Sequence, residues 1–198
     1  SDRKTRRFMP VATPRRRLEM QDGALSCGVE VHLMPVRIKD VFDEVQISLS
    51  GRLKEQSIEA TFRSDAGLAP ALANFEQLVQ VFQNIMENAV QAIAEWDQRP
   101  ECGRLDVLVS ERRGDRSNPR SWVEVRISDN GPGIPAEFRN NIFDPFVTSR
   151  DTGIRDGASG TGLGLAIVKK IVEQHNALIA VESKPGRGAC FIISLPRA

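Results

Sequence analysis

The run QNIMENAVQA, at residues 83–92, lies inside a long amphipathic pattern and decides the fold of this chain. Apolar side chains recur at helical spacing across residues 74–96. This stripe comprises Phe75, Leu78, Val79, Phe82, Ile85, Met86, Ala89, Ile93 and Trp96. At about 100° per residue, Asn84 and Asn88 fall one turn apart on the opposite face. We therefore predict a helix that buries one side and presents two amide side chains on the other.

The first of two glycine-rich loops, DNGPGI at residues 129–134, follows a predicted strand at 121–129. Asp129 has the same parity as the apolar residues of that strand, so the carboxylate leaves from its apolar side. A charge there is costly unless it has a partner or a role. A carboxylate can accept a hydrogen bond from an adenine amino group, and glycines let the backbone pass close to a flat ring. Taken alone, Asp-Asn-Gly is also an ordinary turn signal.

The second loop, GTGLGL at residues 160–165, precedes an apolar helix predicted at 162–175. Backbone N–H groups of such a loop can meet phosphate oxygens at the helix N-terminus. No GxxxxGK[ST] run exists, and the GxGxG spacing is not the dinucleotide fingerprint. Mg²⁺ needs oxygen ligands and keeps several waters, so one amide oxygen and phosphates suffice. The asparagine pair could also be a solvated helix face, but the three motifs together indicate an ATP site.

The remaining pattern predicts an α/β two-layer sandwich, with a mixed sheet of about five strands covered on one face by about three helices. Residues 147–160 are small, polar and glycine-rich, which is typical of a mobile loop. Further helices are predicted at 36–52 and, beginning at Pro135, at 135–143. The strands are predicted at 57–63, 104–112, 121–129, 177–183 and 189–195.

The composition limits the class of protein and the kinds of partner that this chain can have. The chain has 198 residues, 40% hydrophobic and 27% charged, which is ordinary for a globular protein. Its net charge of +1 gives no strong attraction to nucleic acid, and no apolar run approaches the roughly 20 residues of a membrane span.

We interpret residues 1–35, which are rich in arginine, as a linker or the remnant of a preceding region. A patch for nucleic acid or acidic lipid is the alternative, without interleaved aromatic residues to support it. Residues 36–198 then form one domain.

The motifs, in this order, resemble the catalytic ATP-binding domain of bacterial sensor histidine kinases. That family belongs to a superfamily shared with gyrase B, Hsp90 and MutL, whose ATP-binding fold is the Bergerat fold. Asn84–Ala92 resembles the N box, Asp129–Ile134 the G1 box, Phe143–Phe146 the F box and Gly160–Leu165 the G2 box. The resemblance covers about residues 36–196. The amino-acid sequences of these boxes are most similar to those of the nitrogen-regulation group of kinases.

The resemblance implies a role for each motif. Asn88 coordinates Mg²⁺ bound to the triphosphate of ATP, and Asn84 lies beside the metal and its waters. Asp129 bonds the adenine amino group in a slot that glycines shape. Residues 147–160 form the ATP lid, hinged by Phe146, with Arg150 reaching the phosphates. The implied nucleotide-binding residues are Asn84, Asn88, Asp129, Gly131, Gly133, Ile134, Phe146, Thr148, Arg150, Gly160, Thr161, Gly162, Leu163 and Gly164.

Some positions depart from the family pattern. Many members carry a basic residue where Gln91 stands, and a Thr-Thr pair is replaced by Ala189-Cys190. The phosphoacceptor histidine normally lies in a helical hairpin before the ATP domain. Here His32 lacks a following acid and His175 falls late in the last helix, so we interpret both as structural.

The implied partners are therefore a phosphoacceptor hairpin, in the same protein or in trans, and a downstream response regulator. No nucleic-acid partner is expected. The domain is expected in the cytoplasm, within a parent protein that is dimeric and bound at the inner face of the membrane.

Three alternative functions stay open at this point. One is a protein-serine kinase of the anti-sigma type, and another is a pseudokinase that only binds nucleotide. The third is a hydrolysing ATPase of the gyrase or MutL kind. Those ATPases place a glutamate base one turn before the metal-binding asparagine, where this chain has Asn84, so efficient water activation is not expected.

Overall fold

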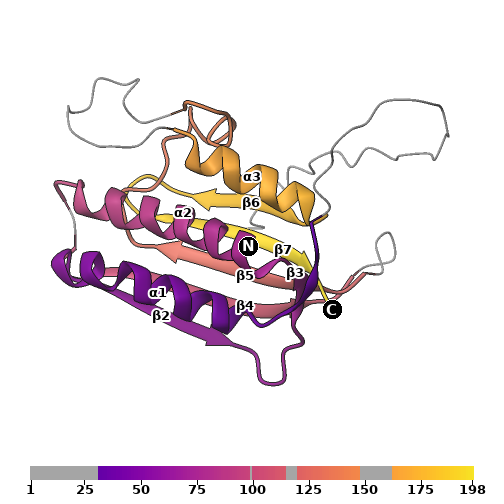
Figure 1. The fold of residues 1–198 in the computed structure, drawn as a ribbon. Coiled ribbons are helices and arrows are strands. Elements are labelled where there is room, and N and C mark those ends of the chain that lie inside the picture. Colours follow the sequence, from indigo (N-terminus) through magenta and orange to yellow (C-terminus); the bar gives the residue numbers. More distant parts are fainter. Residues whose placement is uncertain (1–30, 99, 115–119, 148–161) are drawn as a thin grey trace, which may run out of the picture.

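The chain folds into two layers, a sheet and a set of helices (Figure 1). The computed structural model describes residues 31–98, 100–114, 120–147 and 162–198. Its main sheet has five strands in the order β2-β4-β5-β7-β6. The strands are β2 (Ile58–Ser64), β4 (Gly103–Arg112), β5 (Trp122–Asp129), β6 (Leu178–Ser183) and β7 (Ala189–Pro196). Only the pair β2 and β4 is parallel among these neighbours, so the sheet is mixed, as predicted.

Three helices of the described chain pack on the same face of this sheet (Figure 1). They are α1 (Ile38–Glu55), α2 (Phe75–Ala94) and α3 (Gly164–Gln174). Helix α2 lies in the middle and contacts both α1 and α3. The core forms between the helices and the inward residues of the strands, such as Val107, Val125 and Ile193, which are almost completely buried. This arrangement confirms the predicted two-layer sandwich.

Helix α2 forms where the amphipathic stripe predicted it. Its N-cap is Asn74, whose side chain accepts a hydrogen bond from the Gln77 N–H at 3.0 Å. Val81 and Val90 are buried although the predicted stripe omits them. The reason is that α2 packs between two other helices as well as on the sheet, which buries a wider arc than one stripe. Trp96 lies beyond the end of the helix and is only partly buried.

A second, two-stranded sheet was not predicted. It pairs β1 (Met34–Val36) with β3 (Ala71–Ala73) in antiparallel fashion, and an isolated bridge joins Ala71 to Arg197. Each strand has three residues, too few for an alternation pattern to be visible in the sequence. Strand β3 leads directly into α2, so this small sheet fixes the point at which α2 begins. Strand β1 lies across the boundary placed at residue 35.

The helix predicted at 135–143 was wrong. The segment instead makes successive turns, each closed by one bond between residues three apart. The N–H groups of Phe138, Asn141 and Asp144 donate to the carbonyls of Pro135, Phe138 and Asn141 at 3.2, 3.1 and 2.9 Å. Adjacent residues Ile142 and Phe143 both pack on the core, and the Phe143 and Phe191 rings form a T-shaped pair with their centroids 6.3 Å apart. Because this packing pulls neighbouring side chains inward together, it overrides the weak local preference for a helix.

Candidate functional site

Asp129 ends β5 on the helix-covered side of the sheet, as its parity predicted. The carboxylate is half-buried, and its Oδ1 accepts hydrogen bonds from the N–H groups of Gly131 at 2.9 Å and Ala189 at 3.3 Å. Burial raises the pKa of Asp129 above that of an ordinary carboxyl, and the two backbone donors oppose this rise. Both bonds end at Oδ1, so Oδ2 keeps lone pairs for a ligand that can donate.

The space beside this carboxylate depends on Gly131. A Cβ atom at position 131 would lie 3.0 Å from Asp129 Oδ1 and 3.2 Å from Ile93 Cγ1 of α2. A side chain there would therefore press on both the carboxylate and the helix. Glycine leaves a flat strip of backbone at this point, which suits a planar ring lying next to the acid.

Asn130 fixes the loop that carries these residues. Its Oδ1 accepts from the Arg104 N–H at 2.7 Å, and its Nδ2 donates to the Cys102 carbonyl at 3.2 Å. The loop is thus attached to the beginning of β4 as well as to the end of β5. From the sequence, Asn130 is recognisable only as a turn residue.

The turn at residues 184–188, between β6 and β7, packs directly on the same loop. A Cβ atom at Gly133 would lie 2.3 Å from the Lys184 carbonyl oxygen, and one at Gly188 only 1.9 Å from the Asp129 carbonyl oxygen. The Ile134 N–H donates to Ser183 Oγ at 2.8 Å. These contacts make the turn a support of the site, a role that the sequence pattern does not predict. The only sequence signal for this role of the turn is a second glycine, Gly188, which lies two residues after Gly186 in a hairpin turn.

Asn84 and the second glycine-rich loop come together across α2 and α3. A Cβ atom at Gly164 would lie 3.3 Å from Asn84 Oδ1, so the amide group of Asn84 lies against bare backbone at the start of α3. Asn88, one turn further along α2, is exposed. The two asparagines predicted to act together therefore differ: one contacts the glycine loop, and the other faces outward. Gln91 donates to Glu95 Oε1 at 2.9 Å.

A backbone hydrogen bond connects Phe146 to Gly162, although the two residues are separated in the sequence by residues 147–161. The Phe146 N–H donates to the Gly162 carbonyl at 3.0 Å, and both residues have left-handed backbone, with φ of 66° and 67°. This conformation is costly for phenylalanine, and Phe146 is 71% exposed. Thr148, Arg150, Gly160 and Thr161, which sequence analysis also assigned to the site, lie outside the described residues, as does most of the predicted lid at 147–160.

The Ala189-Cys190 pair lies beside the site in a way that the sequence did not reveal. Ala189 supplies the backbone donor to Asp129, whereas Cys190 pairs with Ser128 in the sheet register. Because neighbouring positions on a strand face opposite sides, the Cys190 side chain lies on the other face of the sheet. Burial raises the pKa of this thiol above its ordinary value.

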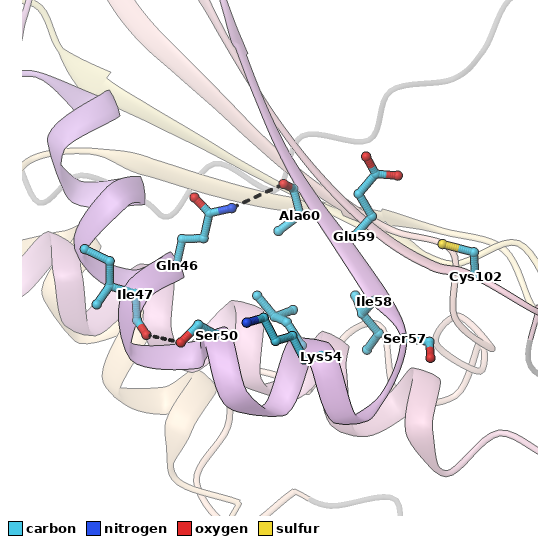
Figure 2. A pocket seen from close by; sticks show the side chains of 10 residues that line it. Gln46, Ile47, Ser50, Lys54, Ser57, Ile58, Glu59, Ala60 and Cys102 are labelled. Atoms are coloured by element: carbon cyan, nitrogen blue, oxygen red, sulfur yellow. Dashed lines mark hydrogen bonds between the residues drawn. The ribbon is translucent and has the colours of Figure 1, made fainter.

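An open groove elsewhere on the molecule is separate from this site. Figure 2 shows it between α1 and the edge strand β2. Gln46 of α1 reaches across it and donates to the Ala60 carbonyl at 3.5 Å. None of the residues predicted to bind nucleotide lines the groove. The residues that line it are Gln46, Ile47, Ser50, Leu53, Lys54, Ser57, Ile58, Glu59, Ala60 and Cys102.

Comparison with known proteins agrees with this geometry. Residues 73–198 match the family described as histidine kinase-, DNA gyrase B-, and HSP90-like ATPase. This match covers more than half of the chain, and it includes every residue proposed for the site. The chain belongs to this ATPase family.

Similar individual proteins are sensor kinases. The sensory histidine kinase/phosphatase NtrB of Rhodobacter capsulatus is 40% identical over 167 residues, which cover 84% of this chain and 44% of NtrB. The catalytic domain of histidine kinase ThkA superposes with a TM-score of 0.66 at 25% identity, covering 83% of this chain and 95% of that domain. Full-length ShkA in complex with AMPPNP gives a TM-score of 0.66 at 28% identity, covering 86% of this chain and 32% of ShkA. The chain thus spans less than half the length of the NtrB relative.

Proposed function

We propose that this chain is the ATP-binding catalytic domain of a two-component sensor histidine kinase. In this proposal it donates the γ-phosphate of ATP to a histidine on a dimerisation hairpin. The observation that carries it is the half-buried Asp129 carboxylate beside the bare backbone of Gly131. The acid faces a strip with room for a flat ring, and Asn84 lies at the second glycine loop on the same side of the sheet.

Asp129 selects adenine in this proposal. Its Oδ2 accepts from the exocyclic amino group of the base, which guanine lacks at the equivalent position. Gly131 and Gly133 shape the slot, with Ile134 on its edge. Phe146 and the backbone of residues 162–164 border the phosphates. Thr148, Arg150, Gly160 and Thr161 complete the set on the strength of the sequence motifs alone.

Asn88 is the proposed Mg²⁺ ligand. An exposed amide oxygen one turn from Asn84 suits a hard cation that keeps most of its water and takes further ligands from phosphates. When bound, Mg²⁺ neutralises charge on the phosphates during transfer. Asn84 orients the waters around the metal, since its own amide is already placed against Gly164.

The acceptor histidine is proposed to lie outside this chain. His175 is 1% exposed, its Nε2 accepts from the Asn74 N–H at 3.0 Å, and its Nδ1 lies 2.8 Å from the Ile171 carbonyl oxygen. Both ring nitrogens are occupied, so neither can attack a phosphate. His32 is exposed but lies in an irregular segment just before β1, without a surrounding hairpin in the described chain.

A response regulator is the proposed partner that takes the phosphate onward. One solved structure similar to this chain, with a TM-score of 0.62 at 23% identity, is described as ThkA in complex with the response regulator protein TrrA. That likeness concerns the fold, and the partner enters here through the kinase proposal. We further propose that the domain, which the described structure extends to include β1 (Met34–Val36), lies in the cytoplasm, with the residues before β1 as a linker to a dimeric parent at the inner face of the membrane. Among the described helices, none combines the length and the apolar character of a membrane span.

Hydrolysis is the function that the site supports least. The position of the catalytic glutamate in hydrolysing relatives is Asn84 here, and an amide cannot accept a proton from water. A serine kinase or a pseudokinase has no observation in its favour among the residues described.

The deciding experiment has two stages. The purified chain is first titrated with ATP, AMPPNP and GTP, with and without Mg²⁺, by calorimetry. It is then mixed with Mg-ATP and a separately produced hairpin that carries the acceptor histidine of a similar NtrB protein. We expect Mg-dependent, adenine-selective binding, slow hydrolysis, and acid-labile phosphate on the hairpin. Equal affinity for ATP and GTP would remove the adenine role of Asp129. Binding without transfer to the hairpin would favour the pseudokinase, and rapid turnover without a hairpin would favour the ATPase.

A further inference from the structure

Helix α3 contacts α2 at both of its own ends, with the middle of α2 at one end and the N-cap of α2 at the other. At one end Asn84 of α2 lies against Gly164, the first residue of α3. At the other end Asn74, the N-cap of α2, contacts His175, the C-cap of α3. The helices therefore run in opposite directions. The two contacts are ten residues apart on α2, or about 15 Å at 1.5 Å per residue.

The contact at the far end is a defined hydrogen-bonded clamp. A backbone N–H can only donate, so His175 Nε2 must accept from Asn74 and carries no proton. A carbonyl can only accept, so Nδ1 carries the proton and donates it to Ile171. The imidazole is therefore neutral, in a single tautomer, with both nitrogens used. His175 is 1% exposed, so water does not compete for either ring nitrogen.

Asn74 is where three segments meet. Its Oδ1 caps α2 through the Gln77 N–H, its Nδ2 donates to the His32 carbonyl at 3.4 Å, and its own N–H goes to His175. That N–H lies at the junction of β3 and α2, before the first helical bond. If His175 were apolar, the N–H would lose its acceptor, which is costly in a partly buried position.

We propose that His175 is a positioning residue for the nucleotide site. By tying the end of α3 to the beginning of α2, it sets how the backbone of residues 162–164 meets Asn84. A helix is stiff along its axis, so a shift at His175 moves Gly164 at the other end of the same eleven-residue helix. This inference rests on the proposed function, because it assigns a purpose to the spacing of residues proposed to bind nucleotide.

Two substitutions at this position separate the hydrogen bonds from the packing. His175→Leu fills similar space without a donor or acceptor. His175→Gln keeps a long side chain with an acceptor for Asn74 and a donor for Ile171. A stability control is Leu53→Ala in α1, which removes buried apolar volume (Leu53 is 6% exposed) away from α3. All measurements are made well below the melting transition of each variant.

Two readouts decide the proposal. The first is hydrogen exchange at the Ile167 amide, which donates to Leu163 at 2.9 Å in the first turn of α3. The second is Mg-ATP affinity. We expect His175→Leu to speed exchange at Ile167 and to weaken affinity on the order of tenfold, a size typical of residues that orient a site's ligands. His175→Gln should restore most of both, and Leu53→Ala should change neither.

Two results would overturn the clamp. One is an exchange rate at Ile167 in His175→Leu equal to that of the wild type. The other is a loss of Mg-ATP affinity in Leu53→Ala that stands in the same proportion to its loss of stability as it does in His175→Leu. If the wild-type chain bound no nucleotide, the proposed function would fail, and exchange at Ile167 in the free protein would still decide whether His175 positions α3.

Discussion

Asn84 and Gly164 meet across the interface of α2 and α3. A Cβ atom on residue 164 would lie 3.3 Å from Asn84 Oδ1. The two residues are 80 positions apart in the sequence and belong to two different motifs. Their contact places an amide of the first motif at the bare backbone of the second. This makes residue 164 a point where one methyl group can test the site without disturbing the core.

Gly164→Ala should weaken nucleotide binding without loss of stability. Alanine is the better helix former by about 0.5–1 kcal/mol, so the free energy of unfolding should hold or rise. The new methyl group would displace the Asn84 amide by a few tenths of an ångström, and Mg-ATP affinity should fall several-fold. Calorimetry and thermal melting check the two effects separately.

Gly51→Ala is the matched control for that substitution. Gly51 also lies in a helix, α1, but a Cβ there would meet nothing within 4 Å. Stability should rise by about 0.5–1 kcal/mol, and affinity should stay at the wild-type value. If both alanine variants bound nucleotide like the wild type, the contact with Asn84 would have no role in binding.

Asp129→Asn should make the protein more stable and less selective. Burial raises the native pKa of Asp129, so the charged form costs stability. That cost is absent below the ordinary carboxyl pKa of about 3.9 and develops as pH rises through the raised native value. Asparagine keeps an acceptor for Gly131 and Ala189 without the charge.

We therefore expect a higher melting temperature for Asp129→Asn than for wild type at pH 7, with the gain shrinking as the pH is lowered toward 4. In the same variant, the preference for ATP over GTP should fall. Melting curves across this pH range and paired calorimetric titrations test the two halves. A variant that melts below the wild type at pH 7 would show that the charge has a stabilising partner.

Gly186→Ala and Gly188→Ala compare strain with collision inside one turn. Both glycines have left-handed backbone, with φ of 71° and 76°. A side chain at 186 meets open space, whereas one at 188 would lie 1.9 Å from the Asp129 carbonyl oxygen. Gly186→Ala should cost about 1–2 kcal/mol, the penalty of the conformation alone.

Gly188→Ala should cost roughly 3 kcal/mol or more, because the loop bearing Asp129 must move as well. It should also lose adenine selectivity, which Gly186→Ala should keep. Urea unfolding gives the stabilities, and ATP and GTP titrations give the selectivity. Equal costs at the two positions would mean that the loop can move aside freely.

Asn88→Ala should remove the Mg²⁺-dependent part of ATP binding and leave the fold intact. The residue is exposed on a helix, where alanine is at least as favourable. Gln80→Ala, an exposed position two turns earlier on the same helix, is the control and should change nothing. The measurement is ATP affinity with Mg²⁺ and with chelator. An Asn88→Ala variant that keeps its full response to Mg²⁺ would exclude Asn88 as the metal ligand.

Much of this architecture could be predicted from the sequence because its signals are local. Alternation in β4 and β5 and the stripe of α2 are set by which side chains face the core, so those elements formed where expected. Asp129 also left the sheet on the side that its parity indicated. The segment at 135–143 failed because its apolar residues Ile142 and Phe143 are adjacent, and packing on the core decided its backbone.

What the sequence could not reveal is long-range contact. Nothing local to Gly188 shows that it lies under Asp129, and nothing local to His175 shows that Asn74 is its partner. Strands β1 and β3 are too short to show a period. These features arise only when segments far apart in the chain are packed together, and they include most of the supports of the proposed site.

The hydrogen bond between Phe146 and Gly162 also bears on how the chain between them can vary. This bond holds the two residues together in the fold, and the entropy of closing a flexible loop rises only slowly with the number of residues in it. Doubling that number costs about 0.6 kcal/mol. We therefore expect the fold to tolerate a change in the number of residues between Phe146 and Gly162.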